Sequence, residues 1–330
     1  MNKGLFGQPR SNDRHGLNVG DIVVSTDPTS FGIDQFVPIN VAVKEAYHKD
    51  VLADFGLSYT EDFHTDSVDT TPTGLGNDVA FSPDGQFMAV AHAASPFVTI
   101  YSISGTTFTK LTNPASLPTG DGNDVAFSPN GQFMAVAHNT SPYITIYSIS
   151  GTTFTKLANP ASLPAFTGNG VAFSPDGQFM AVAHNNSPFI TIYSISGTTF
   201  TKLSNPASLP TSIGYDVVFS PDGQFMAVAH ATSPFITIYS ISGTTFTKLS
   251  NPASLPTDIS IGVAFSPDGQ FMAVAHGTSP YITIYLISGT TFTKLTNPAS
   301  LPTNTGYGVA FSPDGQFMAV AHDTSPYITI

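Results

Sequence analysis

Short apolar runs along the chain alternate with polar turn residues, and the whole pattern recurs at a fixed spacing. The string VAFSPDGQFMAVAH starts at Val79 and returns 46 residues later at Val125 (125 − 79 = 46), with at most one substitution in any copy. Further copies start at Val171, Val217, Val263 and Val309. Each period holds four runs rich in Val, Ile, Thr, Phe and Tyr, separated by Gly, Pro and Ser, which is typical of β-strands joined by tight turns. Four strands in a repeat of roughly 40 to 50 residues predict a β-propeller.

The copies also predict the number of blades. In the first repeat the expected strands read DVAF, QFMAVAH, FVTIYSIS and TTFTKL, and Ser82 to Gly85 form the first turn. Six copies of the first three strands are present, but only five copies of the fourth. We therefore expect an all-β propeller of four-stranded blades, with six blades favoured and seven possible if the natural chain continues past Ile330. Phe81, Phe87, Val90, Val98 and Ile100, with their equivalents, are the expected core between blades.

The non-repeating N-terminus predicts the domain organisation. Residues 1–56 form a docking or anchor segment, and residues 57–330 form the propeller, with repeats that start near 76, 122, 168, 214, 260 and 306. Pro72-Thr73-Gly74 lies one period before Pro118-Thr119-Gly120, so the flank is in phase with the repeat. Residues 57–66 are therefore expected to supply the missing outer strand of the last blade, because an unpaired sheet edge invites aggregation.

The repeat resembles a known family. VAFSPDGQFMAVAH is similar to the first two strands of a WD-repeat blade, and VTIYSI stands where that family has its third strand. The resemblance covers residues 76–330. It departs at Tyr101-Ser102, which replaces the Trp-Asp pair, and the chain has no tryptophan. A short non-repeating segment ahead of a repetitive display domain also resembles the layout of phage tail, fibre or head-decoration proteins.

Composition narrows the classes of partner and compartment. The net charge is −12 and only 10% of residues are charged, so no basic surface for nucleic acid is expected. The chain has no cysteine, which excludes disulfides and thiolate chemistry. No apolar stretch approaches the roughly 18 residues of a membrane span, and the N-terminus lacks the apolar region of a signal peptide. We expect a protein made in a cytoplasm and located in a virion, or alternatively a cytoplasmic protein.

The few differences among the copies fall in two sets of loops, which a four-stranded blade places on one face. These are the loop between the second and third strands and the loop that leads into the next blade. Drift in surface loops explains such variation, but the SPDG and SGTT turns hardly vary, which favours recognition by the variable face. The candidate binding residues are Ala94, Asp121, Asn139, Thr140, Phe166, Asn185, Asn186, Tyr215, Thr232, Thr278, Tyr307 and Asp323.

Two other recurring groups could carry chemistry. His92 and its equivalents end every second strand and could be metal ligands, but neighbouring blades hold them too far apart, so a structural hydrogen bond into the following loop is favoured. Asp78, Asp124 and Asp216 stand near the expected channel where the other blades have Gly. Carboxylates of this kind could hold Ca²⁺, although hydrogen bonding within turns is the simpler reading. Neither a metal nor a cofactor is expected.

These features together predict a function without catalysis. An active site needs several different groups at one point, whereas near-perfect repetition supplies one group six times. We therefore expect no enzyme but a structural or adhesion component of a virion. Its expected partners are other virion proteins or a host-surface receptor or glycan, and it is expected to form a homo-oligomer within an assembly. The alternatives are a multivalent lectin-like propeller, in which weak sites sum to avidity, and a cytosolic interaction scaffold.

Overall fold

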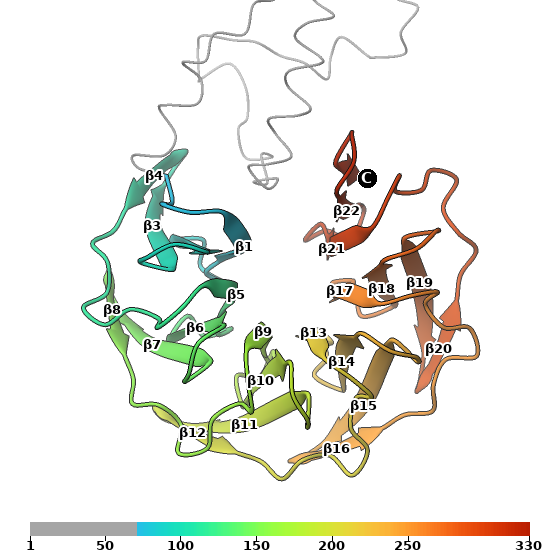
Figure 1. Ribbon diagram of the computed structural model, residues 1–330, viewed down its shortest axis with the longest axis horizontal. Helices are drawn as coiled ribbons and strands as arrows, with labels where there is room; N and C mark the ends of the chain where they lie inside the picture. Colours follow the sequence, from blue (N-terminus) through green and yellow to red (C-terminus); the bar gives the residue numbers. More distant parts are fainter. Residues whose placement is uncertain (1–70) are drawn as a thin grey trace, which may run out of the picture. The chain divides into compact units, whose positions relative to one another are not determined.

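A computed structural model of the chain describes residues 71–330, and every regular element among these residues is a β-strand. The strands form six antiparallel sheets, and in each sheet the strands lie in chain order. Figure 1 shows the sheets arranged radially, with the first strand of each sheet innermost. The prediction of an all-β propeller with six blades of the four-stranded kind is therefore confirmed.

Each of the first five blades has four strands, and their bounds follow the 46-residue period. Blade one contains β1 (Gly76–Phe81), β2 (Phe87–His92), β3 (Val98–Ser104) and β4 (Thr107–Lys110). Blade two contains β5 (Gly122–Phe127), β6 (Phe133–His138), β7 (Ile144–Ser150) and β8 (Thr153–Lys156). Blade three contains β9 (Gly168–Phe173), β10 (Phe179–His184), β11 (Ile190–Ser196) and β12 (Thr199–Lys202).

Blade four contains β13 (Gly214–Phe219), β14 (Phe225–His230), β15 (Ile236–Ser242) and β16 (Thr245–Lys248). Blade five contains β17 (Ser260–Phe265), β18 (Phe271–His276), β19 (Ile282–Ser288) and β20 (Thr291–Lys294). Blade six has three described strands, β21 (Gly306–Phe311), β22 (Met318–His322) and β23 (Ile328–Thr329).

The core lies between blades, because both faces of each sheet are apolar. One face, which we call the outgoing face, packs on the next blade; in blade two it consists of Phe133, Ala135, Ala137, Ile144 and Ile146. The incoming face packs on the preceding blade; in blade three it consists of Val171, Met180, Val182, Tyr193 and Phe200. At the outer end of each of the four interfaces among blades one to five, two phenylalanine rings meet edge to face, with centroids 5.4 Å apart for Phe133 and Phe200. The expected core positions Phe87, Val98 and Ile100 are buried as predicted, but Phe81 and its equivalents are at least partly exposed.

The SPDG turn recurs because its own side chains hold it. The Ser82 hydroxyl donates to Asp84 Oδ1 at 2.6 Å, and the amide of Phe87 donates to Ser82 Oγ at 2.9 Å. Gly85 takes the left-handed conformation (φ 69°), which an amino acid with a Cβ adopts only at a cost. The same hydrogen bonds recur in later blades, for example between Ser174 and Asp176.

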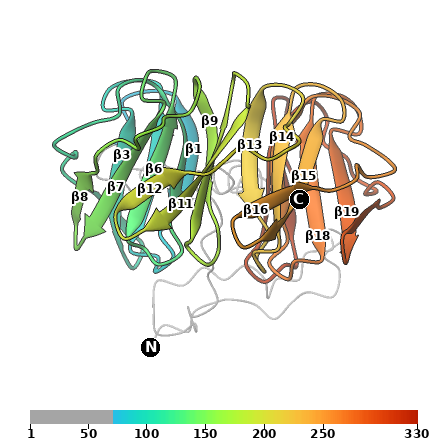
Figure 2. The same cartoon turned by 90° about the horizontal axis from the view of Figure 1, so that it is seen from below.

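On the opposite face a tight loop joins the second strand to the third. In every blade the aromatic residue after Ser-Pro has a positive φ, as in Tyr143 (φ 68°), which is uncommon for a bulky side chain. Two backbone hydrogen bonds hold it there: its amide donates to Thr140 O at 2.8 Å, and its carbonyl accepts from the amide of His138 at 3.1 Å. The amide of Asn139 donates to Asp121 O at 3.2 Å, so this loop and the loop entering the blade lie side by side. Both loops therefore open on one face, as the sequence predicts, and Figure 2 gives the view along the sheets.

The arc of blades is open at its ends. Successive innermost strands pack in chain order from β1 on β5 to β17 on β21, and Figure 1 shows an opening between β1 and β21. The predicted anchor segment 1–56 and the predicted closing strand 57–66 lie outside the described residues and stay predictions. Within residues 71–330 there is no helix that could cross a membrane.

Candidate active site

The innermost strands bring three carboxyl groups together from three different blades. Asp78 lies on β1, Asp124 on β5 and Asp216 on β13. Their charges influence one another: Asp124 interacts with both Asp78 and Asp216, and the Asp78 and Asp124 side chains are hydrogen-bonded. Asp78 and Asp124 are thus neighbours and Asp216 lies within electrostatic range of both; we call these three groups the central carboxyl cluster.

Each carboxylate also ties its own blade to the following one. Asp78 Oδ2 accepts from the amide of Val125 at 3.1 Å, and Asp124 Oδ2 accepts from the amide of Val171 at 2.5 Å. Asp216 Oδ2 accepts from the amide of Val263 at 2.8 Å. These bonds link each blade to the next, whereas the sequence predicted hydrogen bonds within turns.

A parallel row of amide side chains supports the same junctions. Asn77, Asn123 and Asn169 each donate through Nδ2 to the first-strand carbonyl of the following blade, at Gly122, Gly168 and Gly214, over 2.7 to 2.8 Å. These bonds fix the spacing of the inner strands. Backbone and side-chain amide groups therefore hold the central carboxyl cluster in a fixed position.

Close packing of the inner strands accounts for glycine in blades three and five. A Cβ on Gly170 would lie 2.9 Å from Asp216 Cα, and a Cβ on Gly262 would lie 2.8 Å from the carbonyl oxygen of Tyr307. No side chain fits at these two positions without a shift of the neighbouring backbone. At Gly308 of blade six a Cβ would meet nothing within 4 Å, so packing does not explain that glycine.

Burial raises the pKa of two members of the central carboxyl cluster, Asp124 and Asp216. Desolvation, the Asp78 charge and the hydrogen bond with Asp78 raise the pKa of Asp124 well above its usual value. Desolvation also raises the pKa of Asp216 to about 6, against the opposing effect of the backbone amides of Val263 and Val217. Carboxyls with raised pKa values can exchange protons nearer neutral pH than ordinary ones, which is what acid–base chemistry requires.

The histidine repeated in each blade is structural. Every imidazole places Nε2 within hydrogen-bond distance of a threonine on the adjacent third strand, as in His138 and Thr145 at 2.9 Å. The sequence predicted a structural hydrogen bond, but into the following loop; the partner is on the strand instead. Burial lowers the pKa of His138, His184 and His230 to about 4, so these rings are neutral at pH 7.

The predicted binding residues lie in the paired loops of the variable face, and many of them contact one another. Asn139 and Asp121 exchange two hydrogen bonds of 3.0 Å, and Asn169 donates to Asn185 Oδ1 at 2.6 Å. Thr232 and Thr278 meet the hydroxyls of Thr211 and Thr257 at 3.0 and 3.1 Å. These residues therefore also have a structural role in joining the paired loops, which the comparison of the repeats alone did not indicate.

The aromatic members of this set differ in exposure. Phe166 is 44% exposed and its ring lies 5.6 Å from that of Tyr143, while Tyr307 is 50% exposed. Tyr215 is partly buried, and its carbonyl lies 3.0 Å from where a Cβ on Gly170 would stand. The remaining members, Ala94, Thr140, Asn186 and Asp323, lie in loops between second and third strands. Binding of a partner by the variable face stays a prediction.

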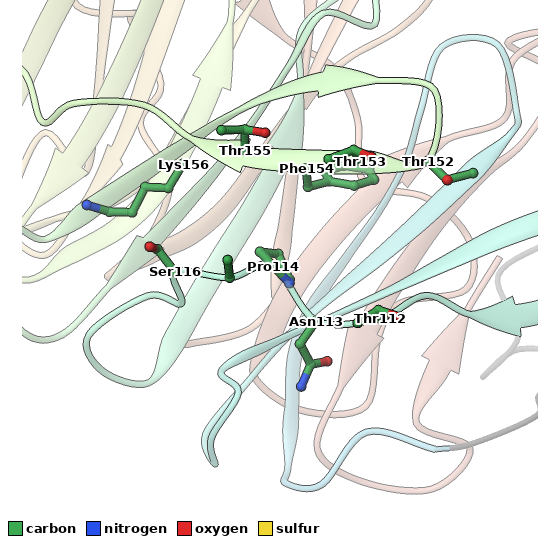
Figure 3. Close-up of a pocket in the computed structure, with 10 residues that line it drawn as sticks. Thr112, Asn113, Pro114, Ser116, Thr152, Thr153, Phe154, Thr155 and Lys156 are labelled. Carbon is green, nitrogen blue, oxygen red and sulfur yellow. The ribbon is translucent and has the colours of Figure 1, made fainter.

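A separate hollow of about 310 Å³ lies on the outer rim, between β8 and the link that follows β4 (Figure 3). Thr112 to Ser116 and Thr152 to Lys156 line it. Its one cationic group, Lys156 Nζ, lies 3.0 Å from Asn159 Oδ1. The hollow offers hydroxyl and amide groups but no carboxyl, so it is less suited to acid–base chemistry than the central carboxyl cluster.

Comparison with known proteins corrects the predicted function. The sequence matches the family described as lactonase, 7-bladed beta-propeller, over residues 47–162 and 78–261. Similar solved structures include a putative 6-phosphogluconolactonase from Bacteroides fragilis (15% identity, TM-score 0.62, 76% of this chain and 78% of that one). The periplasmic gluconolactonase of Pseudomonas aeruginosa is similar too (16% identity, TM-score 0.61, 76% and 79%).

The fold itself is not restricted to lactonases. The hydrazine synthase of Kuenenia stuttgartiensis has 19% identity and a TM-score of 0.61, over 80% of this chain and 77% of that one. The search among curated proteins gave no match. At these identities the solved structures establish only the propeller fold, and the family match is what assigns the chain to a family.

The predictions of a non-enzymatic function and of a virion component are therefore wrong. The first rested on the argument that repetition supplies only identical groups, but the Asp and Gly exchanges on the inner strands break that repetition. The second rested on the layout of a short non-repeating segment ahead of a repetitive domain, and the family match overturns it. The two matched ranges together span residues 47–261, more than half of the sequence. The chain belongs to the lactonase family of seven-bladed β-propellers.

Proposed function

We propose that the protein hydrolyses a lactone, the internal ester of a hydroxy acid, at the central carboxyl cluster. The observation that carries the proposal is the convergence of Asp78, Asp124 and Asp216 on the innermost strands of a lactonase-family propeller. The names of the similar bacterial proteins point to the same reaction class. Ester hydrolysis needs a base to activate water and an acid to protonate the leaving oxygen, and the cluster offers a carboxyl for each role.

The raised pKa values assign the two roles. Asp216, with a pKa of about 6, is mostly ionised at pH 7 and accepts a proton from the attacking water. The water oxygen forms a bond to the lactone carbonyl carbon. The ring C–O bond then breaks, and Asp124, whose pKa is raised well above its usual value, acts as the acid that protonates the departing alkoxide. One water is consumed, the product is the open hydroxy acid, and proton exchange with solvent restores both carboxyls.

The surrounding hydrogen bonds support these roles. The amides of Val263 and Val217 hold both oxygens of Asp216, at 2.8 and 2.7 Å, so its carboxylate has a fixed orientation. A fixed base avoids the cost of reorientation when the proton moves. The product carries a new carboxylate, which the acidic cluster repels, and this repulsion favours product release.

The test is hydrolysis of an aldonolactone such as gluconolactone, which a pH-stat measures through the acid that is released. Asp124→Gly should lower kcat by about 10²- to 10⁴-fold, the usual contribution of a general acid. The fold already accepts Gly at this position in blades three, five and six, so the variant should fold. The matched control is Asp176→Asn, because blade two carries Asn130 at the equivalent turn position; its activity should equal that of the parent.

Two results would contradict the proposal. One is the absence of hydrolysis, by the folded protein, of any lactone in a panel with five- and six-membered rings. The other is unchanged kcat in Asp124→Gly. The pH profile adds a separate check, since kcat/KM should rise through an apparent pKa near 6 as Asp216 ionises.

A further inference from the structure

The second residue of each innermost strand divides the blades into two groups. Blades one to three carry an amide side chain there, whereas blades four to six carry an aromatic or aliphatic one. In blade order the residues are Asn77, Asn123, Asn169, Tyr215, Ile261 and Tyr307. The position follows directly on the loop that enters each blade, so it lies at the variable face. The inner strands therefore present a polar half and an apolar half to a ligand that arrives from this face.

A β-bulge makes this second residue point the same way as the third. In every blade the pairing with the second strand shifts register here, as between Gly122 and Asp124. Successive side chains of a regular strand alternate between its two faces, but a bulge re-aims one of them. In blade two, Asn123 Nδ2 donates to Gly168 O at 2.8 Å and Asp124 Oδ2 accepts from the amide of Val171. Both side chains thus reach the following blade from one side of the strand.

The same bulge in blade four places Tyr215 beside Asp216. The register again shifts ahead of Asp216, whose Oδ2 accepts from the amide of Val263 in the following blade at 2.8 Å. Tyr215 is only partly buried, so part of its ring is open to a ligand. Tyr307 occupies the equivalent position in blade six, but there the next residue is Gly308. Among the described inner strands, blade four alone joins an aromatic ring to a member of the central carboxyl cluster.

The two halves suit different chemical groups. Asn77 and Asn123 already donate through Nδ2 to backbone carbonyls at 2.8 Å, which leaves Oδ1 and one N–H for hydroxyl or carbonyl groups of a ligand. The Tyr215 ring instead offers an apolar face, and covering it with hydrocarbon is favourable by about 25 cal/mol per Å² of apolar surface removed from water. The neighbouring carboxylates repel an anionic substituent. A neutral hydrocarbon substituent is therefore the group that fits beside Asp216.

We propose that Tyr215 determines substrate specificity, and that the preferred substrate is a neutral lactone whose hydrocarbon substituent packs on the Tyr215 ring. The proposal rests on lactone hydrolysis at the central carboxyl cluster and adds which lactones are preferred. Because Tyr215 and Asp216 are adjacent, the substituent has to lie close to the ester group that reacts. A short chain on the ring carbon next to the ring oxygen meets this requirement.

The repeat supplies both a test variant and its matched control. Tyr215→Asn reproduces the Gly-Asn-Asp sequence of blades one and two, and Tyr307→Asn reproduces the Gly-Asn-Gly of blade three, so both proteins should fold. The substrates are δ-valerolactone and the same ring with a propyl chain next to the ring oxygen. The parent should hydrolyse the propyl lactone with about tenfold higher kcat/KM, and Tyr215→Asn should remove this preference. Tyr307→Asn should retain it.

Binding of the corresponding lactams separates this inference from the proposed reaction. A lactam has the shape of the lactone but resists hydrolysis, so dissociation constants from NMR titrations report on selectivity alone. The propyl lactam should bind the parent about tenfold more tightly than the unsubstituted lactam, and Tyr215→Asn should bind the two equally. That result in a protein that hydrolyses no lactone would contradict the proposed function while supporting the role of Tyr215.

Two outcomes would overturn the role of Tyr215 even if both lactones are hydrolysed. One is a parent protein that binds the two lactams equally well and hydrolyses the two lactones at equal kcat/KM. The other is a preference for the propyl compounds that Tyr215→Asn leaves intact, or that Tyr307→Asn removes to the same extent.

Discussion

Blades two to four and blade six have the same repeat but different surroundings. Phe133, Phe179 and Phe225 are 5 to 6% exposed, whereas the identical Phe317 of blade six is 60% exposed. Interior blades have a neighbour on both faces, while the outgoing face of blade six meets none of the described blades. Burial of a residue here depends on the adjacent blade more than on its own strand. Identical sequences should therefore contribute unequal amounts to stability.

The largest expected difference follows acidification, which acts on the interior histidines. The pKa of His138, His184 and His230 in the folded protein is about 4, below the ordinary value of 6.5. Between these two values the unfolded chain binds protons more readily than the folded chain does. Stability is thus fully present above pH 6.5 and falls as the pH drops toward 4. At pH 5 each histidine should cost about 2 kcal/mol.

The raised pKa values of Asp216 and Asp124 act in the opposite direction, Asp216 by about 1 kcal/mol between pH 7 and pH 5. Because three histidines outnumber these two carboxyls, the net effect should be a loss of stability, measured as the urea midpoint at the two pH values. Replacing His184 by Gln in a matched protein should reduce the pH dependence. A midpoint that stays constant from pH 7 to pH 5 would show that these rings are not buried as described.

The next contrast compares one substitution at two equivalent positions. Phe179→Ala should cost about 3–5 kcal/mol, because it removes a ring packed edge to face on Phe246 and leaves a cavity between two blades. Phe317→Ala should cost about 1 kcal/mol or less, since that ring is mostly exposed. Urea denaturation of both variants gives the comparison. Equal losses would mean that another part of the protein covers blade six.

The smallest contrast concerns the inner strands. Gly170→Ala should cost about 1–3 kcal/mol, because its Cβ would press on the backbone of Asp216 at 2.9 Å. At Gly308 of blade six a Cβ meets nothing within 4 Å, so Gly308→Ala should stay within about 0.5 kcal/mol of the parent. Thermal melts of the two variants distinguish the cases, and a reversed order would contradict the described packing of β9 on β13.

The repeat carried enough information to predict the architecture. Alternation of apolar residues in FMAVAH and ITIYSIS fixes which side chains face each neighbour, and SPDG fixes the turn through its own Ser and Asp side chains. Phe81 was expected in the core and is 36% exposed, whereas Phe127 and Phe173 at the equivalent position are partly buried against the core between blades. Phe81 belongs to blade one, which no described blade precedes, so its exposure reflects its place in the array and not its own strand.

The site could be predicted only in part. Asp78, Asp124 and Asp216 were singled out because they break the repeat, but their mutual contact depends on how closely the inner strands converge. The reason for Gly170 and Gly262 is likewise visible only in the approach of the following strand. Because nearly every group recurs in each blade, the repeat alone did not show that a few substitutions near the axis place carboxyls of different environments close together.

The uniform pairing of outgoing and incoming faces has a consequence for how such a gene can change. Removing residues 168–213, one whole period, would set Phe133 and its neighbours against an incoming face with the same residues as the one they lost. Unequal exchange between repeats therefore adds or deletes a blade without ever creating a mismatched core. The number of blades can drift in single steps, while the few unrepeated side chains near the axis decide which of the resulting rings still possesses a working site.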